Sequence, residues 1–321
     1  MKVVSESRIV LVLVWALSSA WLLPVAAQDV DFGYVRGIGG TSDENASGIA
    51  RDSLGNSYVG GYFQGTPDFD PGAGTNAIAS AGQYDGFIGK YDPDGDLIWV
   101  HTFGDVDYDY IFGVAVDSAD NVYVTGTFLG TVDFDPGPGT QSVTAPSFFS
   151  EAFVLKLDSD GNFLWVKIIT GAGSEIGFAI ILDGSGNIYS MGQFTGTADF
   201  DPGPGTDNIA SLSGNDLYIQ KLDSAGNYLW AATVDGEVRD FGRFMSLDST
   251  GAVYLTAGFQ GTVDFDPGVG VVNQTSAGDS DIFIWKLDAS GNLVWIHALG
   301  NTNDDDGASV AIDSADNVIV A

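Results

Sequence analysis

The chain contains no cysteine, and only two of its 321 residues are histidine. The absence of cysteine excludes disulfides, thiolate metal sites and a lipid anchor on a leader cysteine. His101 and His297 each follow a tryptophan by two residues, and no His-x-His or His-Glu-x-x-His spacing occurs. A Gly-x-Ser-x-Gly nucleophile motif is also absent. The sequence therefore offers no recognisable nucleophile and no histidine-based metal centre.

Positive charge is scarce. The chain has 11 Lys and Arg against 43 Asp and Glu, which gives a net charge of −32. Binding to nucleic acid needs a basic face, so a nucleic-acid partner is excluded, and an anionic membrane surface is disfavoured for the same reason. The composition is nevertheless 45% hydrophobic and 12% aromatic, which is enough to build a core. The charge is typical of a soluble folded protein and leaves cation binding open.

Long apolar runs are scarce too, and the one that occurs lies at the N-terminus. Lys2 and Arg8 precede an apolar stretch from Ile9 to Val25, and small residues follow at Ala26 and Ala27. This order is typical of a cleaved signal peptide, here residues 1–27. No second run approaches membrane length, so no integral membrane segment is expected after cleavage. We therefore expect a secreted or cell-surface protein whose mature part is one repeat domain, residues 28–321.

The mature chain is an internal repeat with a spacing of 65 or 66 residues. One anchor is Asp-x-Asp-Pro-Gly, and a second is Lys-x-Asp-x-x-Gly followed four residues later by Trp. A third is an Asp that ends an apolar run. The first anchor occurs at Asp68–Gly72, Asp133–Gly137, Asp199–Gly203 and Asp264–Gly268. The second runs from Lys90 to Trp99, Lys156 to Trp165, Lys221 to Trp230 and Lys286 to Trp295. The third is Asp52, Asp117, Asp183, Asp248 and Asp313.

Each copy is predicted to form two β-hairpins, and no stretch has convincing helical periodicity with caps. In the second copy the strands are expected at 114–116, 122–128, 153–157 and 163–168, with turns at 118–121 and 159–162. Gly161 is expected to adopt positive φ in the second turn. The strands are apolar on both faces, which suits burial between neighbouring sheets.

The sequence thus predicts an all-β fold, a β-propeller or partial propeller arc of four-stranded antiparallel blades with about 65 residues per blade. Four blades are complete and a fifth is partial, and residues 31–37 resemble a fourth strand that could close the ring. An unfinished fifth unit favours a fragment of a longer protein, since repeat arrays need finished ends. The units span approximately residues 40–104, 105–170, 171–235, 236–300 and, in part, 301–321.

The repeat resembles the bacterial "seven-bladed β-propeller" family, abbreviated SBBP. The resemblance lies in Asp-x-x-Gly-Asn-x-Tyr-Val-x-Gly-x-Phe, seen from Asp52 to Phe63, and in its continuation from Asp281 to Trp295. Glu151 and Ala257 depart from the pattern. The family is mostly extracellular and largely without assigned activity, so the resemblance implies a fold more than a function. A looser likeness to the tryptophan-docking motif of quinoprotein propellers implies that the repeated Trp residues pack between blades. This likeness does not imply a quinone cofactor.

The paired aspartates of the Asp-x-Asp-Pro-Gly loops are the candidate metal site. Calcium prefers six to eight oxygen ligands, and these loops bring two carboxylates together with exposed carbonyl groups. The alternative is structural, because Asp before Pro-Gly commonly forms an Asx turn. The candidate calcium ligands are Asp68, Asp70, Asp133, Asp135, Asp199, Asp201, Asp264 and Asp266.

Four of the few basic residues recur within otherwise apolar strands, at Lys90, Lys156, Lys221 and Lys286. A ring of cations facing a channel would bind an anionic ligand. The favoured interpretation is an internal ion pair with an Asp of the same or the next blade, because a buried lysine needs a partner. Acids outside the symmetric positions are better candidates for catalysis, and Glu175, Glu237 and Asp304–Asp306 are assigned to blade-joining loops.

These observations favour a non-catalytic module that binds a protein or a glycan through its inter-blade loops. No catalytic residue and no cofactor other than calcium is assigned. Two alternatives stay open. The first is an enzyme on a propeller scaffold, a polysaccharide lyase or hydrolase, which would place asymmetric polar residues at one mouth of the channel. The second is an architectural segment of a larger surface protein.

Overall fold

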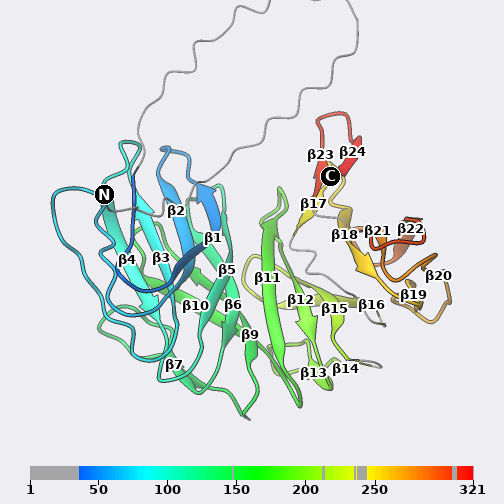
Figure 1. Cartoon of the computed structure of the whole chain (residues 1–321), viewed down its shortest axis with the longest axis horizontal. Coiled ribbons are helices and arrows are strands. Elements are labelled where there is room, and N and C mark those ends of the chain that lie inside the picture. Colours follow the sequence, from blue (N-terminus) through cyan, green and yellow to red (C-terminus); the bar gives the residue numbers. More distant parts are fainter. Residues whose placement is uncertain are drawn as a thin grey trace, which may run out of the picture. The chain divides into compact units, whose positions relative to one another are not determined.

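The structure, a computed structural model, describes residues 36–146, 148–211, 214–234, 236, 244–305 and 309–320. These residues form antiparallel β-sheets and contain no helix, as the sequence predicts (Figure 1). None of the sheets in this part of the chain closes on itself. The predicted signal peptide and residues 31–35 of the proposed closing strand lie outside the described residues. Arg36 and Gly37 are not in a strand, and Arg36 forms an ion pair of 3.1 Å with Asp96.

Two sheets come first in the chain, each with four main strands in sequence order. The first contains β1 (Glu44–Arg51), β2 (Ser57–Phe63), β3 (Asp85–Tyr91) and β4 (Leu97–Phe103). The second contains β5 (Tyr110–Val116), β6 (Val122–Phe128), β9 (Glu151–Leu157) and β10 (Phe163–Gly171). All four strands expected in the second copy are present, with β5, β9 and β10 longer than expected.

Two further sheets repeat this order. The third contains β11 (Glu175–Leu182), β12 (Ile188–Phe194), β15 (Asp216–Leu222) and β16 (Tyr228–Val234). The fourth contains β17 (Met245–Leu247), β18 (Val253–Phe259), β21 (Asp281–Leu287) and β22 (Leu293–Leu299). At the C-terminal end, β23 (Val310–Ile312) and β24 (Val318–Val320) form a separate hairpin.

Short hairpins lie between the second and third strands of the later sheets. They are β7 (Thr131–Asp133) with β8 (Ser142–Thr144), β13 (Thr197–Asp199) with β14 (Asn208–Ala210), and β19 (Thr262–Asp264) with β20 (Asn273–Thr275). The β13–β14 hairpin joins the second sheet, because β13 pairs with the end of β10. The Asp-x-Asp-Pro-Gly loops connect the two strands of each hairpin and so lie outside the main four strands.

The turns between paired strands follow from one Asp and one Asn or Gly. In the first turn of the second sheet, Asp117 Oδ1 accepts the backbone N–H groups of Ala119 and Asn121 at 2.9 Å. In the second turn of that sheet, Gly161 takes φ of 85°, as predicted, a conformation that a side chain disfavours. These local bonds stop the strand and reverse it, which explains why the motif recurs in each copy.

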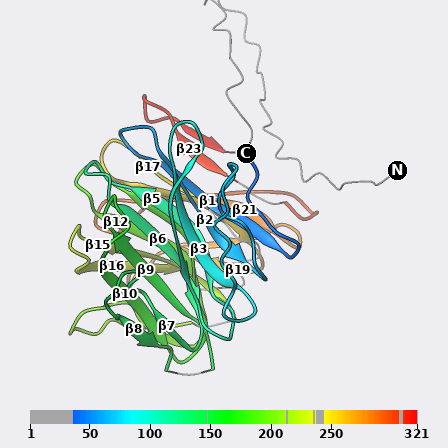
Figure 2. The ribbon, with the colours of Figure 1, turned by 90° about the vertical axis from the view of Figure 1, so that its left-hand side faces the viewer.

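The second strand of each later sheet is enclosed on both sides. All seven residues of β6, β12 and β18 are buried. Glycines permit the close approach of the first two sheets: a Cβ at Gly60 would lie 2.6 Å from the Val114 side chain and 2.8 Å from that of Ile111. Figure 2 shows β1, β2 and β3 beside β5 and β6. The prediction that apolar strands are buried holds for the second and third strands of the sheets, whereas the fourth strands, such as β10, are only partly buried.

Candidate functional site

Six of the eight candidate calcium ligands lie at or just after the end of the first strand of a short hairpin. The other two, Asp68 and Asp70, lie in the equivalent segment of the first sheet, where Asp68 forms an isolated bridge with Ala77. The first Asp of each loop caps the backbone across the loop: Asp68 Oδ1 accepts N–H groups from Asp70 at 3.0 Å and Asn76 at 2.8 Å. The same two bonds recur with close distances at Asp133, Asp199 and Asp264. One oxygen of each of these carboxylates therefore holds the loop closed.

The second Asp of each loop forms the expected Asx turn. Asp70 Oδ1 accepts the N–H of Gly72 at 2.8 Å, and the equivalent bonds at Asp135, Asp201 and Asp266 have the same length. The carboxylate of Asp70 also lies against Gly74, where a Cβ would meet its Oδ2 at 2.0 Å. The described residues contain no group of three or more His, Cys, Asp or Glu side chains arranged to hold a metal. The structural role is thus formed in every copy, and calcium binding stays a prediction.

The four repeated lysines form internal ion pairs, the favoured interpretation of the sequence. Each pairs with the Asp that ends the first strand of its own sheet, at 3.4 Å for Lys90 with Asp52 and 3.1 Å for Lys286 with Asp248. The pairs of the second and third sheets, Lys156 with Asp117 and Lys221 with Asp183, measure 3.7 and 3.9 Å. Each ammonium also lies 4.6–5.0 Å from the centroid of a buried tyrosine ring. These lysines are used inside the sheets and do not form a ring of cations.

The pKa values reflect these pairs. Burial acts to raise the pKa of Asp52, but hydrogen bonds from Asn56 and the charge of Lys90 outweigh it and leave the pKa below its usual value. The pKa of Lys221 is lowered, because burial outweighs the attraction of Asp183 at the longer distance. Both changes follow from burial and from partners within the same sheet, so the pairs suit a structural role.

The repeated tryptophans pack against the next sheet, as the sequence predicts. Trp99 Nε1 donates to the carbonyl of Ser159 at 3.4 Å, and Trp230 Nε1 donates to that of Ala289 at 3.1 Å. The lysine of the same sheet reaches the same carbonyl, Lys90 at 2.8 Å and Lys221 at 2.9 Å. One backbone oxygen in the second turn of the second sheet, and one in the second turn of the fourth, therefore receives two donors from the preceding sheet.

Pairs of buried carboxylates at the sheet junctions were missed by the sequence analysis. Glu175, assigned there to a joining loop outside the symmetry, is instead the fully buried first residue of β11, and it faces the fully buried Glu151. Asp109 and Asp305 hold the equivalent place, since each donates its N–H to the residue before the third strand of the preceding sheet. Glu237 and Asp306 lie outside the described residues.

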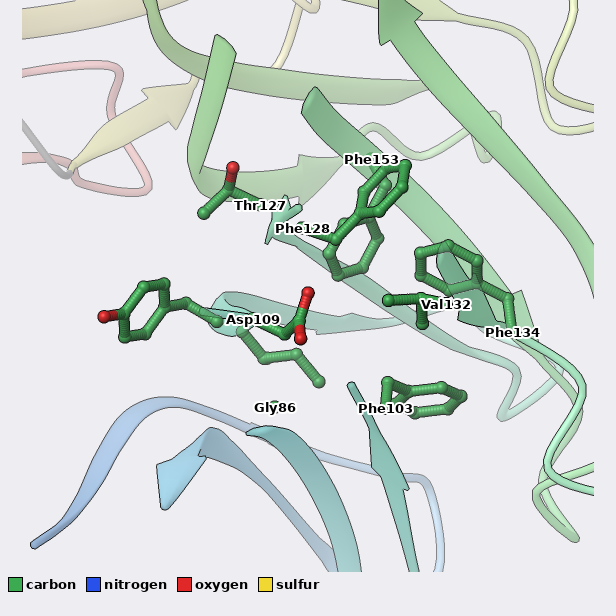
Figure 3. Close-up of a pocket in the computed structure, with 10 residues that line it drawn as sticks. Gly86, Phe103, Asp109, Thr127, Phe128, Val132, Phe134 and Phe153 are labelled. Atoms are coloured by element: carbon green, nitrogen blue, oxygen red, sulfur yellow. The ribbon is translucent and has the colours of Figure 1, made fainter. Parts of the chain in front are cut away.

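Burial controls the protonation of these acids. Burial and then the charge of Glu151 raise the pKa of Glu175 far above its usual value, and burial raises that of Glu151. At the first junction burial raises the pKa of Asp109 to about 7. Figure 3 shows Asp109 beside a small pocket with Phe103, Phe128 and Val132. Two carboxyl groups buried close together do not both ionise readily, so the raised pKa values favour their uncharged forms.

An aromatic group at the first junction breaks the repeat. The tyrosine cluster consists of Tyr62, Tyr84, Tyr108 and Tyr110, with ring centroids 4.8–6.2 Å apart. Tyr108 is 40% exposed, and the other three are half-buried. At the second junction the equivalent residues are Thr127, Ser150, Ser174 and Ile176. At the third junction they are Gln193, Asn215, Arg239 and Phe241. Blade architecture therefore does not require this cluster.

Comparison with known proteins agrees with the fold. The family model described as "Beta-propeller repeat", SBBP, matches residues 34–65 and 98–127. These two matches support the SBBP β-propeller repeat family for this chain. A WD repeat-containing protein of Acanthamoeba polyphaga mimivirus is 27% identical over 223 residues, which cover 60% of this chain and 16% of that protein. This chain therefore matches about a sixth of its relative's length.

One solved structure matches most of the chain at low similarity. A protein of unknown function from Bacteroides caccae has 9% sequence identity and a TM-score of 0.28, with 79% of this chain and 82% of that chain covered. The SBBP match includes the Asp52 turn and the β5–β6 hairpin, which contain the structural Asp residues described above. No helix in the described part of the SBBP chain is long and apolar enough to cross a membrane.

Proposed function

We propose that this SBBP chain is a secreted or cell-surface, non-catalytic module that binds a protein or a glycan through loops at its sheet junctions. The observation that carries the proposal is the difference between residues that recur in the copies and residues that do not. The repeated charged residues are engaged within or between the sheets, whereas the unique tyrosine cluster is partly exposed. Tyrosine combines a large apolar face with a polar group and is favoured at binding surfaces.

The proposal also covers the number and the bounds of the blades. Four complete blades of about 65 residues would span residues 40–104, 105–170, 171–235 and 236–300, with a partial fifth over 301–321. The inter-sheet bonds of the tryptophans and lysines support this division, because they join consecutive copies at the same place. The WD-repeat relative supports an interaction role by likeness alone.

A glycan array and capture of partners from the native medium, followed by titration of each purified hit, test the binding role. Saturable binding to the folded chain and none to the heat-unfolded chain is expected. Turnover of a polysaccharide by the purified chain would overturn the non-catalytic assignment and establish the lyase or hydrolase alternative.

Calcium binding by the Asp-x-Asp-Pro-Gly loops belongs to the same proposal. Support comes from the second oxygens of the paired aspartates, which the backbone bonds described above do not use. Calorimetric titration with Ca²⁺ should give heat, and a chelator should lower the melting temperature. The variant Asp70→Asn keeps the Asx-turn acceptor and removes the charge, so it should weaken the heat at that loop. No heat and no thermal shift would leave the loops with a structural role alone.

A further inference from the structure

We propose that the tyrosine cluster binds an arginine-bearing segment of a protein partner, and this inference rests on the proposed binding role. The first step is position. Tyr62 lies on β2, Tyr84 precedes β3, and Tyr108 and Tyr110 lie before and at the start of β5. A parallel bridge between Tyr84 and Tyr108 brings the two sheets together there. Residues from two sheets thus build one surface at the first junction.

The second step is the arrangement of the rings. Tyr84, Tyr108 and Tyr110 are nearly parallel, with interplanar angles of 15–29°. Tyr62 meets Tyr84 and Tyr110 edge-on, with ring centroids 5.5 and 4.8 Å away. The edge-on ring restrains the parallel set, and the 40% exposure of Tyr108 leaves part of that ring open to a ligand. A planar guanidinium stacks on such a ring better than a compact ammonium does.

The third step is charge. Asp43 accepts a hydrogen bond of 3.2 Å from the Tyr84 hydroxyl, and Asp105 and Asp107 lie in the loop that carries Tyr108. Within the described part of the chain, these three aspartates form no ion pair with lysine or arginine. The negative faces of the rings add to this field. An acidic side chain bonded to one of the rings, in a chain whose net charge is −32, complements a cationic partner.

Binding at the tyrosine cluster has to be distinguished from attraction to the net charge of the whole protein. A net charge of this size attracts any cationic peptide, so affinity for a basic peptide alone shows nothing about the cluster. Preference between two peptides of equal charge is informative, because the long-range field treats them alike. A surface that stacks guanidinium groups prefers arginine over lysine, and this preference should disappear with the exposed ring.

The experiment titrates the mature chain with hexa-arginine and hexa-lysine peptides by calorimetry at physiological salt. We expect the arginine peptide to bind about three times more tightly, as an exposed cation–π contact would give. Tyr108→Ala, which leaves the charge unchanged, should bring the two Kd values together. Phe148→Ala removes a fully exposed aromatic outside the cluster and serves as the matched control, with the preference retained. Melting temperatures of both variants confirm that they are folded.

Three results would overturn the inference. One is equal affinity for the two peptides in the unaltered chain. Another is an arginine preference that survives in Tyr108→Ala. The third is loss, in that variant, of binding to a neutral oligosaccharide such as maltohexaose, which would assign the cluster to a glycan. A protein partner that still binds Tyr108→Ala with unchanged Kd would keep the proposed function and reject this site.

Discussion

The first and second sheet junctions use the same backbone bond but different side chains. Asp109 N–H donates to Tyr84 O at the first junction, and Glu175 N–H donates to Ser150 O at the second, both at 2.8 Å. The first junction adds the bonds from Lys90 and Trp99 to Ser159, and its outer part is the tyrosine cluster. The second adds two fully buried glutamates with a raised pKa.

This difference shows which features a repeat must keep. The shared backbone bond joins neighbouring sheets and the Asp–Lys pairs brace each sheet internally, so both change little along the chain. Buried acids take equivalent places at both junctions, Asp109 at the first and Glu175 at the second, whereas the tyrosines of the first junction are not repeated at the second. Exposed residues that differ between junctions are free to serve recognition. Substitutions at equivalent positions of the two junctions test this difference.

The largest effect is expected from Lys90→Met, which leaves Asp52 buried without its cation. The Asp52 side chain is 1% exposed, and removing one member of a buried pair costs about 3 kcal/mol. Lys90 also supplies a bond to the next sheet, whereas Lys156 has a longer ion pair of 3.7 Å. Urea unfolding followed by tryptophan fluorescence should therefore show a larger loss for Lys90→Met than for Lys156→Met.

The double variant Lys90→Met with Asp52→Asn provides the control. It removes the uncompensated charge, so it should recover part of the stability lost in the single variant. A Lys90→Met chain as stable as Lys156→Met would show that the two junctions depend equally on this position, contrary to the comparison.

Much of this framework follows from the sequence, because it is local or repeated. The Lys–Asp pairs were expected, because every copy has an Asp at the end of its first strand and a lysine within its third strand. The second strand follows that Asp directly and pairs with the third. The Glu151–Glu175 pair was not expected: the two residues come from different sheets, and one was assigned to a loop. Alignment of Glu175 with Asp109 and Asp305 was the available signal.

The tyrosine cluster could not be predicted for a related reason. Tyr62, Tyr84 and Tyr108 are separated by more than twenty residues each, and no periodic pattern links them. Their meeting depends on how the β2–β3 and β4–β5 connections approach one another when two sheets pack. Sequence spacing specifies strands and turns well, but it does not specify contacts between loops of different sheets.

A smaller effect is expected from Glu175→Gln, and it depends on pH. The pKa of Glu175 is raised in the folded protein above its ordinary 4.5, so folding favours the protonated form. Its contribution to stability is complete below pH 4.5 and is lost as the pH rises towards the folded pKa. Glutamine mimics the protonated acid. At pH 8 the variant should be more stable than the unaltered chain by about 1.4 kcal/mol for each unit of pKa elevation that it removes.

The control is Glu44→Gln, at the same repeat position in the first sheet. Glu44 is half-buried and its pKa is raised mainly by burial, so the pH dependence should change less. Unfolding free energies measured in urea from pH 5 to pH 9 compare the two variants. Parallel curves for Glu175→Gln and the unaltered chain would contradict a proton held at the second junction.

The smallest effect is expected at Asp120, which joins the first two sheets through their turns. Its carboxylate accepts the N–H of Ser53 at 2.9 Å and the Ser53 hydroxyl at 2.8 Å, and its φ is 63°. The third copy has Gly186 at this place, with φ of 79°. Asp120→Gly should cost about 1 kcal/mol through the lost bonds. Asp120→Ala should cost more, because alanine is also strained at positive φ. Thermal unfolding of both variants separates the two contributions, and equal melting temperatures would show that the backbone conformation contributes nothing. Gly186→Ala tests the strain alone, since glycine there has no side chain to form the bond to the preceding sheet.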